Sequence, residues 1–290
     1  MKTPAQSELI LNEDGSVYHL KLKDKHIADT VLVVGDQNRV NRISSKFYSI
    51  EYQIDNREFR THTGLYKGVR LTVLSTGIGT DNIDIVINEL DAAVNINPDT
   101  RQVNKTLRSL NIIRLGTTGG IQPEIPIDSL LISEKAVGLD GLLNFYETSI
   151  SEEDKAFEEA FYNHVSFISE LAKPYIRSAS SDLMQRLQGE ALTGFTLTAP
   201  GFYAPQTRSL RLPLKQANLF DKYQTFEYNG KKVTNFEMET SALYGLGQAL
   251  GHHCCTICAV IANRANGVFS KDHSAAEEKL IMYVLNKLTA

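Results

Sequence analysis

The sequence predicts an α/β fold, namely a single domain with a central mixed, largely parallel twisted β-sheet flanked by helices. Short continuous apolar runs recur along the chain, as expected for strands that are buried on both faces. Helix-like segments alternate with these runs, which is the pattern of strand–helix–strand units. No linker rich in Pro, Gly or Ser and no repeat of fixed period divides residues 1–290, so we expect one domain.

The expected strands are short apolar runs, most of which end at glycine or another turn residue. In chain order they cover residues 30–34, 70–75, 111–115, 130–133, 194–198, 232–236 and 254–262. Residues 1–29 precede the first strand, and we expect this extension to lie at a subunit contact.

The expected helices place apolar residues at helical spacing. The clearest follows the second strand, with apolar residues at 83, 86, 87, 90 and 94 and with Thr80 or Asp81 as its expected N-cap. Residues 240–250 predict a helix that stops at Gly251, and residues 275–288 predict the last helix. The polar stretch from residue 152 to residue 188 favours helix without a clear period.

Composition and charge exclude several functional classes. The chain is 42% hydrophobic and 22% charged, which is typical of a globular protein. Its net charge is -4 and it has no long basic run, so we expect no nucleic-acid partner. No apolar run approaches the ~20 residues of a membrane helix, and the polar N-terminus lacks a secretory pattern. We therefore expect a cytoplasmic protein without a membrane partner.

The three cysteines lie together in one apolar segment, at Cys254, Cys255 and Cys258. The Cys-x-x-Cys spacing occurs in metal and redox sites. The segment is β-prone, however, and positions three apart in a strand point to opposite faces, so Cys255 and Cys258 would not hold the same ion. We interpret the segment as a buried strand and predict no metal site.

Two short segments predict a nucleoside site. Residues 201–208 combine an aromatic ring, an amide and a guanidinium at Phe202, Gln206 and Arg208, which suit a flat ring with carbonyl and imide edges such as uracil. Residues 236–239 read Phe-Glu-Met-Glu. Carboxylates accept hydrogen bonds from vicinal hydroxyls, and Met packs against the apolar face of a sugar.

Three glycine-bearing segments are expected as turns at strand ends, where ligands bind in open α/β sheets. They cover residues 35–39, 76–79 and 116–120. Arg39 and Arg114, with nearby hydroxyls and backbone N–H groups, suit a phosphate dianion. Taken singly, each segment is an ordinary loop, and none is a P-loop or a full GxGxxG motif. Together with the nucleoside site they predict a phosphate site.

In these motifs the chain resembles the uridine phosphorylases of the nucleoside phosphorylase family, from about His19 to Arg264. The matching segments, in order, are residues 18–20, 35–40, 57–59, 75–79, 114–119, 202–208, 236–239 and 261–264. The resemblance implies the nucleoside phosphorylase fold and the reversible phosphorolysis of uridine to uracil and ribose 1-phosphate in nucleoside salvage. It also implies a homo-oligomer, dimer or hexamer, whose active sites are shared between subunits.

The resemblance assigns residues to each part of the substrates. Phosphate would be bound by Gly35, Arg39, Arg57, Arg114 and Thr117. Ribose would be bound by His19, Glu237, Met238 and Glu239. The base would be bound by Phe202, Gln206 and Arg208, in a pocket ordered by Arg264. Arg57 and His19 would serve the site of a neighbouring subunit.

Alternatives remain open at this point. A purine-cleaving relative would need an acid near the purine N7, and residues 262–266, Ala-Asn-Arg-Ala-Asn, contain none. A purine or broad-specificity phosphorylase, a hydrolytic nucleosidase of the same fold and a non-catalytic binding protein are the alternatives. Relatives can bind potassium through a glutamate, an isoleucine carbonyl and a serine; Glu58 and Ile78 match, but Asn82 stands in place of serine. We therefore predict no metal and no cofactor other than the co-substrate phosphate.

Overall fold

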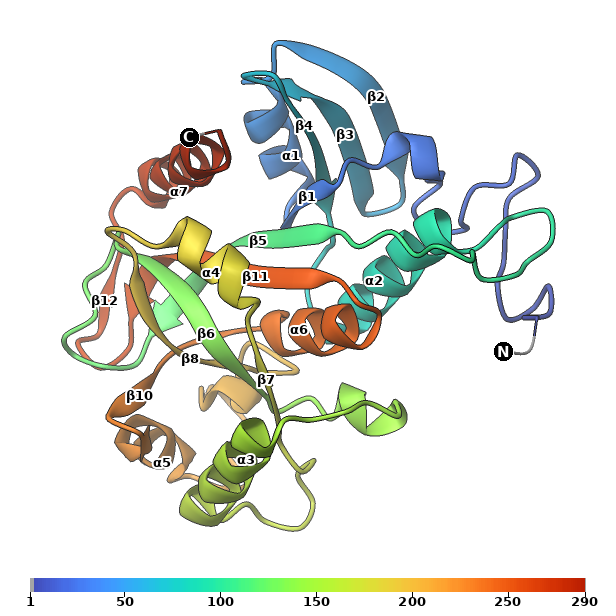
Figure 1. The fold of residues 1–290 in the computed structure, drawn as a ribbon. Coiled ribbons are helices and arrows are strands. Elements are labelled where there is room, and N and C mark those ends of the chain that lie inside the picture. The colour runs from blue at the N-terminus through green and yellow to red at the C-terminus, as the bar shows by residue number, and fades with distance from the viewer. Residues whose placement is uncertain (1–2, 290) are drawn as a thin grey trace.

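The strands of the protein form one mixed sheet that is flanked by helices (Figure 1). The computed structural model describes residues 3–289, so positions 1, 2 and 290 of the predicted domain lie outside the described residues. The strands are β1 Thr30–Val34, β2 Ser49–Asn56, β3 Phe59–Tyr66, β4 Val69–Ser75, β5 Asn111–Gly120, β6 Leu130–Gly138, β7 Tyr175–Ser178, β8 Leu192–Thr198, β9 Glu227–Tyr228, β10 Lys231–Glu237, β11 His253–Asn263 and β12 Val268–Phe269.

The helices alternate with the strands, as predicted. They are α1 Gln37–Ser44, α2 Thr80–Asn95, α3 Glu152–Val165, α4 Ser181–Leu187, α5 Leu219–Thr225, α6 Thr240–Ala249 and α7 His273–Leu288, with short 3₁₀ turns at Asp24–His26, Leu142–Phe145 and Ala204–Gln206. None of the helices described is both long enough and apolar enough to cross a bilayer.

The sheet contains two groups of parallel strands. The first is β4-β1-β5-β11 and the second is β6-β8-β10. Antiparallel pairs β5–β10 and β6–β11 join the groups, so that β5, β11, β6, β8 and β10 close into a ring. The expected α/β architecture with a mixed, largely parallel sheet is confirmed. Because β5 and β10 pair in antiparallel fashion near their last residues, their carboxyl ends lie next to each other.

Helices cover both faces of the sheet. The expected apolar stripe of α2 is buried in a core that also includes Leu243 and Leu246 of α6, and these two helices lie side by side (Figure 1). Val40 and Ile43 of α1 share a second core with the apolar face of α7. A third core under α3 and α5 is rich in aromatic rings, with Phe157 and Phe161 at its centre.

The structure corrects several local predictions. Residues 116–120 are not a turn, because β5 continues through them and pairs with β11 as far as Gly120. The helix α2 begins after Gly79, whose φ of 101° only glycine adopts readily, and neither Thr80 nor Asp81 is its N-cap. The polar stretch 152–188 is not one helical region but α3, β7 and α4. The helix α7 begins at His273, two residues earlier than expected.

Several elements had no prediction. They include both strands of the β2–β3 hairpin, the helices α1 and α5, and the two-residue strands β9 and β12. The hairpin strand β2 has a mixed, half-exposed pattern, and α1 is short and polar apart from Val40 and Ile43. The predicted end of α6 is confirmed, since Gly251 follows it with a φ of 82°. The strand interpretation of the cysteines is also confirmed, because all three lie buried and free in β11.

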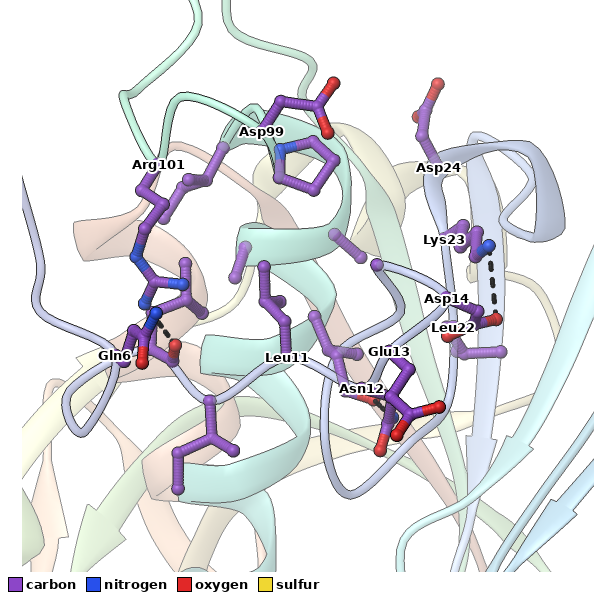
Figure 2. Close-up of a pocket in the computed structure, with 18 of the residues that line it drawn as sticks. Gln6, Leu11, Asn12, Glu13, Asp14, Leu22, Lys23, Asp24, Asp99 and Arg101 are labelled. Atoms are coloured by element: carbon purple, nitrogen blue, oxygen red, sulfur yellow. Dashed lines mark hydrogen bonds and ion pairs between the residues drawn. The ribbon is translucent and has the colours of Figure 1, made fainter.

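The N-terminal extension packs against the far end of α2. Val17, Leu20 and Leu22 are buried in the core that contains α2. The Arg101 guanidinium donates to the backbone carbonyls of Pro4 and Ala5 at 3.0 and 2.8 Å, which fixes the first described residues. A cavity of about 960 Å³ remains between this segment and residues 92–101 (Figure 2). The expected subunit contact stays a prediction.

Candidate functional site

One cavity of about 1100 Å³ collects most of the predicted site residues. It lies at the ends of β1, β4, β5 and β10 and is bordered by the loop at residues 201–208, called the base loop below. The predicted residues that line it are Gly35, Arg39, Arg114, Thr117, Phe202, Gln206, Arg208, Glu237, Met238 and Glu239. Predicted positions that are far apart in the sequence therefore line one cavity.

Arg39 reaches the cavity from the first turn of α1. Asp36 caps this helix by accepting a hydrogen bond from the Asn38 N–H at 3.0 Å. Arg39 is 8% exposed; its Nη1 donates to the Leu115 carbonyl at 3.2 Å and its Nη2 pairs with Glu277 Oε1 at 2.8 Å. Its Nε–H is buried and has no partner among the described residues. Arg39 thus retains donors for a ligand.

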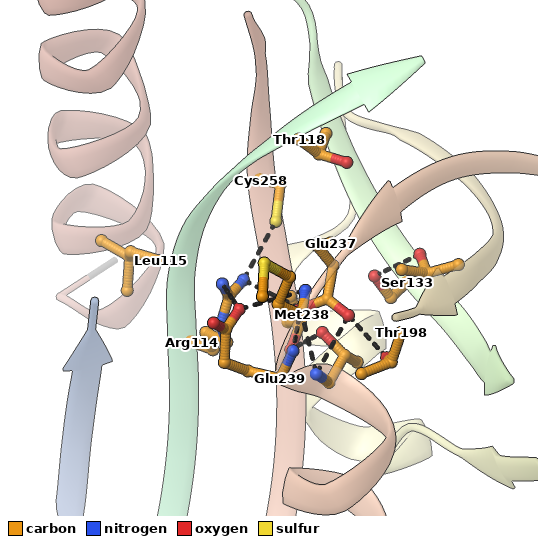
Figure 3. Close-up of polar contacts among 12 residues, drawn as sticks. Arg114, Leu115, Thr118, Ser133, Thr198, Glu237, Met238, Glu239 and Cys258 are labelled. Atoms are coloured by element: carbon orange, nitrogen blue, oxygen red, sulfur yellow. Dashed lines mark hydrogen bonds and ion pairs between the residues drawn. The ribbon is translucent and has the colours of Figure 1, made fainter. Parts of the chain in front are cut away.

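Arg114 lies beside the carboxylates of Glu237 and Glu239 (Figure 3). Its Nη2 pairs with Glu239 Oε2, its Nη1 lies 3.4 Å from Glu237 Oε2, and Nη1 also lies 3.4 Å from Cys258 Sγ. Burial alone would lower the pKa of Arg114, but the attraction of Glu239 and Glu237 outweighs it and raises the pKa. Arg114 is therefore a fixed cation.

Glu237 organises the start of α6. Its Oε1 accepts from Thr198 Oγ1 at 2.6 Å, and its Oε2 accepts from the Glu239 N–H at 2.9 Å. Both oxygens also accept from the Thr240 N–H, so the carboxylate occupies the positive end of the helix. Glu237 therefore supports the turn that carries Met238 and Glu239 rather than presenting a free carboxylate.

Glu239 connects the sugar side of the cavity to the glycine turn at residues 76–79. Its Oε1 accepts from the Gly79 N–H at 2.8 Å and its Oε2 accepts from Arg114. Burial raises the pKa of Glu239, although Arg114 opposes the shift. Met238 is half-buried beside it and lines the same cavity. The two side chains offer an acceptor and an apolar surface next to each other.

The base loop folds around Gln206 and Arg208. Arg208 Nη1 donates to Gln206 Oε1 at 2.6 Å and to the Phe202 carbonyl at 2.7 Å, and the guanidinium lies 4.1 Å from the centre of the Phe202 ring. Phe202 is half-exposed, whereas Gln206 is buried. Because Arg208 fixes the amide, a flat ligand meets an oriented set of polar groups beside an aromatic face.

Arg264 does not line the cavity but lies behind the base loop. Its Nη1 donates to the Gln206 carbonyl and, at 3.1 Å, to Thr207 Oγ1. Burial, together with the nearby Arg208 charge, lowers the pKa of Arg264 to about 10. The guanidinium also lies 4.7 Å from the centre of the Phe220 ring. These contacts suit the expected role in ordering the base pocket.

Arg57 and His19 lie outside the cavity of their own chain. Arg57 is exposed in the turn of the β2–β3 hairpin, where its φ is 54°, and its Nη2 lies 3.4 Å from the Tyr18 hydroxyl. His19 Nδ1 pairs with Glu89 Oε1 at 2.6 Å. The His19 ring also meets the Tyr18 ring edge-on, with centres 4.8 Å apart, so Arg57 and His19 both contact Tyr18. Their expected role at a neighbouring site stays a prediction.

Two residues of the site escaped the sequence analysis. Cys258, which was interpreted only as part of a buried strand, contacts Arg114. Glu277 pairs with Arg39 although 238 positions separate them in the chain. No sequence motif surrounds Glu277, so only the packing of α7 against α1 reveals it.

The three positions considered for potassium, Glu58, Ile78 and Asn82, all border the cavity. Asn82 Nδ2 donates to the Ile78 carbonyl at 3.5 Å. Within residues 3–289, no group of three or more His, Cys, Asp or Glu side chains is arranged to hold a metal ion. The absence of a potassium ion stays a prediction.

Comparison with known proteins decides the family. The sequence profile described as the phosphorylase superfamily matches residues 29–288. The chain belongs to the phosphorylase superfamily. One similar protein is a uridine phosphorylase of Thermococcus kodakarensis. It is 36% identical over 262 residues, which cover 89% of this chain and 82% of the relative.

Other superfamily members are similar at lower identity. A purine nucleoside phosphorylase of the DeoD type from Listeria welshimeri is 27% identical over 262 residues, covering 90% of this chain and 91% of the relative. The solved structure of a Trypanosoma brucei nucleoside phosphorylase, described as showing uridine phosphorylase activity, superposes with a TM-score of 0.87 at 29% identity. That match covers 97% of this chain and 99% of the Trypanosoma chain. The resemblance noted in the sequence is thereby confirmed at the level of the superfamily.

Proposed function

We propose that this chain is a pentosyltransferase that cleaves uridine with inorganic phosphate to uracil and ribose 1-phosphate, in cytoplasmic nucleoside salvage. One observation carries the proposal. Within a single cavity, Arg39 and Arg114 lie beside the Met238–Glu239 pair and the amide–guanidinium pair of the base loop. Two similar proteins support the proposal. One is a uridine phosphorylase, and the other is a nucleoside phosphorylase described as showing uridine phosphorylase activity.

The residue types suit the chemistry of the glycosidic bond. Cleavage of this bond builds positive charge on the ribose ring and negative charge on the departing base. Arg208 offers a fixed cation for the base, and such preorganised electrostatics contribute ~3 kcal/mol per donor. Phosphate held by Arg39 and Arg114 would stabilise the ribose cation and then attack it, so no protein nucleophile is required. Glu239 would accept from the ribose hydroxyls.

The charge balance of the cavity explains why a second subunit would be needed. Arg39 is paired with Glu277, and Arg114 is paired with Glu239 and Glu237. One chain therefore offers hydrogen-bond donors but little net positive charge for a phosphate dianion. We propose a homo-oligomer in which the exposed Arg57 of one subunit supplies that charge to its neighbour, together with His19 on the ribose side.

The test is uridine cleavage with and without phosphate. We expect turnover to require phosphate and to yield ribose 1-phosphate. Equal cleavage without phosphate would identify a hydrolytic nucleosidase, and binding without turnover would identify a binding protein. A substrate panel of uridine, thymidine, cytidine, inosine and adenosine then defines the base.

A purine or broad-specificity phosphorylase is the second candidate, because a DeoD-type purine nucleoside phosphorylase matches most of the chain. The polar groups of the base loop favour a pyrimidine, since a buried donor without its acceptor is costly. Inosine turnover faster than uridine turnover would favour the second candidate.

A further inference from the structure

Arg39 extends from α1, but a carboxylate on α7 holds its guanidinium. Glu277 Oε1 accepts from Arg39 Nη2 at 2.8 Å, and both side chains are close to fully buried. The Leu115 carbonyl accepts from Nη1 at 3.2 Å, so the two outer nitrogens of the fork have fixed acceptors. Such a planar, two-point contact fixes the orientation of a guanidinium as well as its position.

A count of donors indicates what this contact leaves for a ligand. A guanidinium has five N–H groups. Glu277 and Leu115 account for one N–H on each outer nitrogen, while the buried Nε–H has no partner among residues 3–289. A buried donor without an acceptor is costly. Because Arg39 lines the cavity, a bound anion is the natural acceptor for the remaining groups.

Glu277 is distinguished from its neighbour Glu278 by which residues it contacts. Glu277 Oε2 also accepts from Arg42 Nη1 at 2.6 Å, so the carboxylate bridges two arginines of α1. Glu278 pairs with Arg42 at 3.5 Å and with Lys46, but has no contact with Arg39. Both acids join α7 to α1, and only Glu277 acts on the residue assigned to phosphate.

We propose that Glu277 is a positioning residue of the phosphate site, which orients the Arg39 guanidinium toward the anion. The inference rests on the proposed function, because it takes phosphate as the ligand of Arg39. Without Glu277, Arg39 loses the acceptor of one arm of its fork and is free to adopt other rotamers. The cost falls on phosphate binding and not on nucleoside binding, because the predicted nucleoside contacts are His19, residues 237–239 and the base loop, none of which Glu277 contacts.

The experiment measures KM for phosphate and KM for uridine in three variants. Glu277→Ala removes the acceptor, and we expect KM for phosphate to rise about tenfold while KM for uridine changes less than about twofold. Glu277→Gln keeps one carbonyl oxygen for Arg39, so its rise should be smaller. Glu278→Ala is the matched control, with both KM values within about twofold of wild type.

A second readout does not depend on turnover. We expect inorganic phosphate to raise the Tm of wild type and of Glu278→Ala, and to raise that of Glu277→Ala less at the same concentration. An unchanged KM for phosphate in Glu277→Ala overturns the inference, and so does an equal rise in Glu278→Ala, which would indicate general loosening between α1 and α7. A wild-type enzyme that cleaves uridine without phosphate overturns the proposed function, and the inference with it.

Discussion

Arg208 combines a fixed position in the base loop with a partly desolvated positive charge. It lies over Phe202 and fixes the amide of Gln206. Burial lowers the pKa of Arg208, which means that its charge is partly desolvated. Such a charge interacts strongly with negative charge that develops close to it.

We expect Arg208→Ala to lower kcat/KM for uridine by about 100-fold or more, because the departing uracil anion loses its cation. Arg208→Lys keeps the charge without the planar fork, so its loss should be smaller but clear. The control is Arg211→Ala, since Arg211 is exposed in the following loop. Steady-state kinetics would test this, and similar values for Arg208→Ala and Arg211→Ala would contradict it.

The burial of the three cysteines of β11 predicts how they react with a thiol reagent. All three are buried and free, and burial raises the pKa of the Cys258 thiol to about 11. A thiol that is both protonated and inaccessible reacts slowly. We expect a thiol reagent at pH 8 to label none of the three in the native protein and all three after unfolding. Rapid labelling of the native protein would contradict the burial described for β11.

Single residues were predictable where the chain carries a motif. Arg39, Glu239 and Gln206 stand in local patterns whose chemistry suits a ligand, and the cavity collects all three. Glu277 was not predictable, because an acid on the polar side of an amphipathic helix has no distinguishing signal. Its contact with Arg39 follows from tertiary packing alone, and the same is true of the contact between Cys258 and Arg114.

Among the elements, β5 shows why the boundaries of strands were harder to predict than their existence. The run 111–115 is apolar, whereas residues 116–120 are glycines and threonines that favour a turn. Pairing with β11 on one side and β10 on the other overrides that local preference. Gly116 also has a packing reason, since a Cβ there would come within 2.0 Å of Arg114 Nη1.

The helix α3 is joined to the sheet by a buried ion pair. Lys135 of β6 donates to Asp154 at 2.6 Å and to Ser178 of β7 at 2.8 Å, and it also pairs with the exposed Glu153 at 3.1 Å. Breaking a buried pair on one side leaves an uncompensated charge. We expect Asp154→Ala to reduce the free energy of unfolding by about 3 kcal/mol, and Glu153→Ala by less than about 1 kcal/mol.

Urea denaturation would measure the free energy of unfolding of both variants. Equal losses of stability in the two variants would contradict the assignment of Asp154 as the main partner of Lys135.

The ion pair between Lys135 and Asp154 also predicts that stability depends on pH. Burial lowers the pKa of Lys135, but the bonds to Asp154 outweigh it and raise the pKa above 10.5, its value in an unfolded chain. The contribution to stability is therefore complete below pH 10.5 and is lost as the pH rises through the folded pKa. Asp154→Ala should show less of this alkaline loss.

At the scale of the whole molecule, the alternation of strands and helices predicted the fold class but not the closure of the sheet. The pairing of β11 with β5 joins residues more than a hundred positions apart, and no local pattern encodes it. The same closure determines which predicted residues meet. It brings Arg114 on β5 and Glu237 on β10 within one cavity, whereas Arg57 in the turn of the β2–β3 hairpin does not line that cavity.

The position of Arg57 leads to a prediction about assembly. We expect Arg57→Ala and Arg114→Ala to be weakly active alone, since each removes one cation of the proposed phosphate site. When the two chains are mixed in one oligomer, some sites combine an intact Arg114 with an intact Arg57 from the neighbour. Random mixing should restore about one quarter of wild-type activity. A mixture no more active than the average of the two variants would contradict a shared site.

The closed ring of strands also limits how the chain can associate with copies of itself. A strand that is paired on both sides offers no free backbone groups to another chain, and this holds for β5, β11 and β8. At one end of the strand order, the outer rim of β2 keeps such groups, next to the exposed side chains of Glu51 and Asp55. Both carboxylates are paired with arginines, Glu51 with Arg70 of β4 at 2.8 Å and Asp55 with Arg60 of β3 at 2.7 Å. An identical rim would have to desolvate these charged side chains before its backbone could pair, which discourages fibre-like stacking.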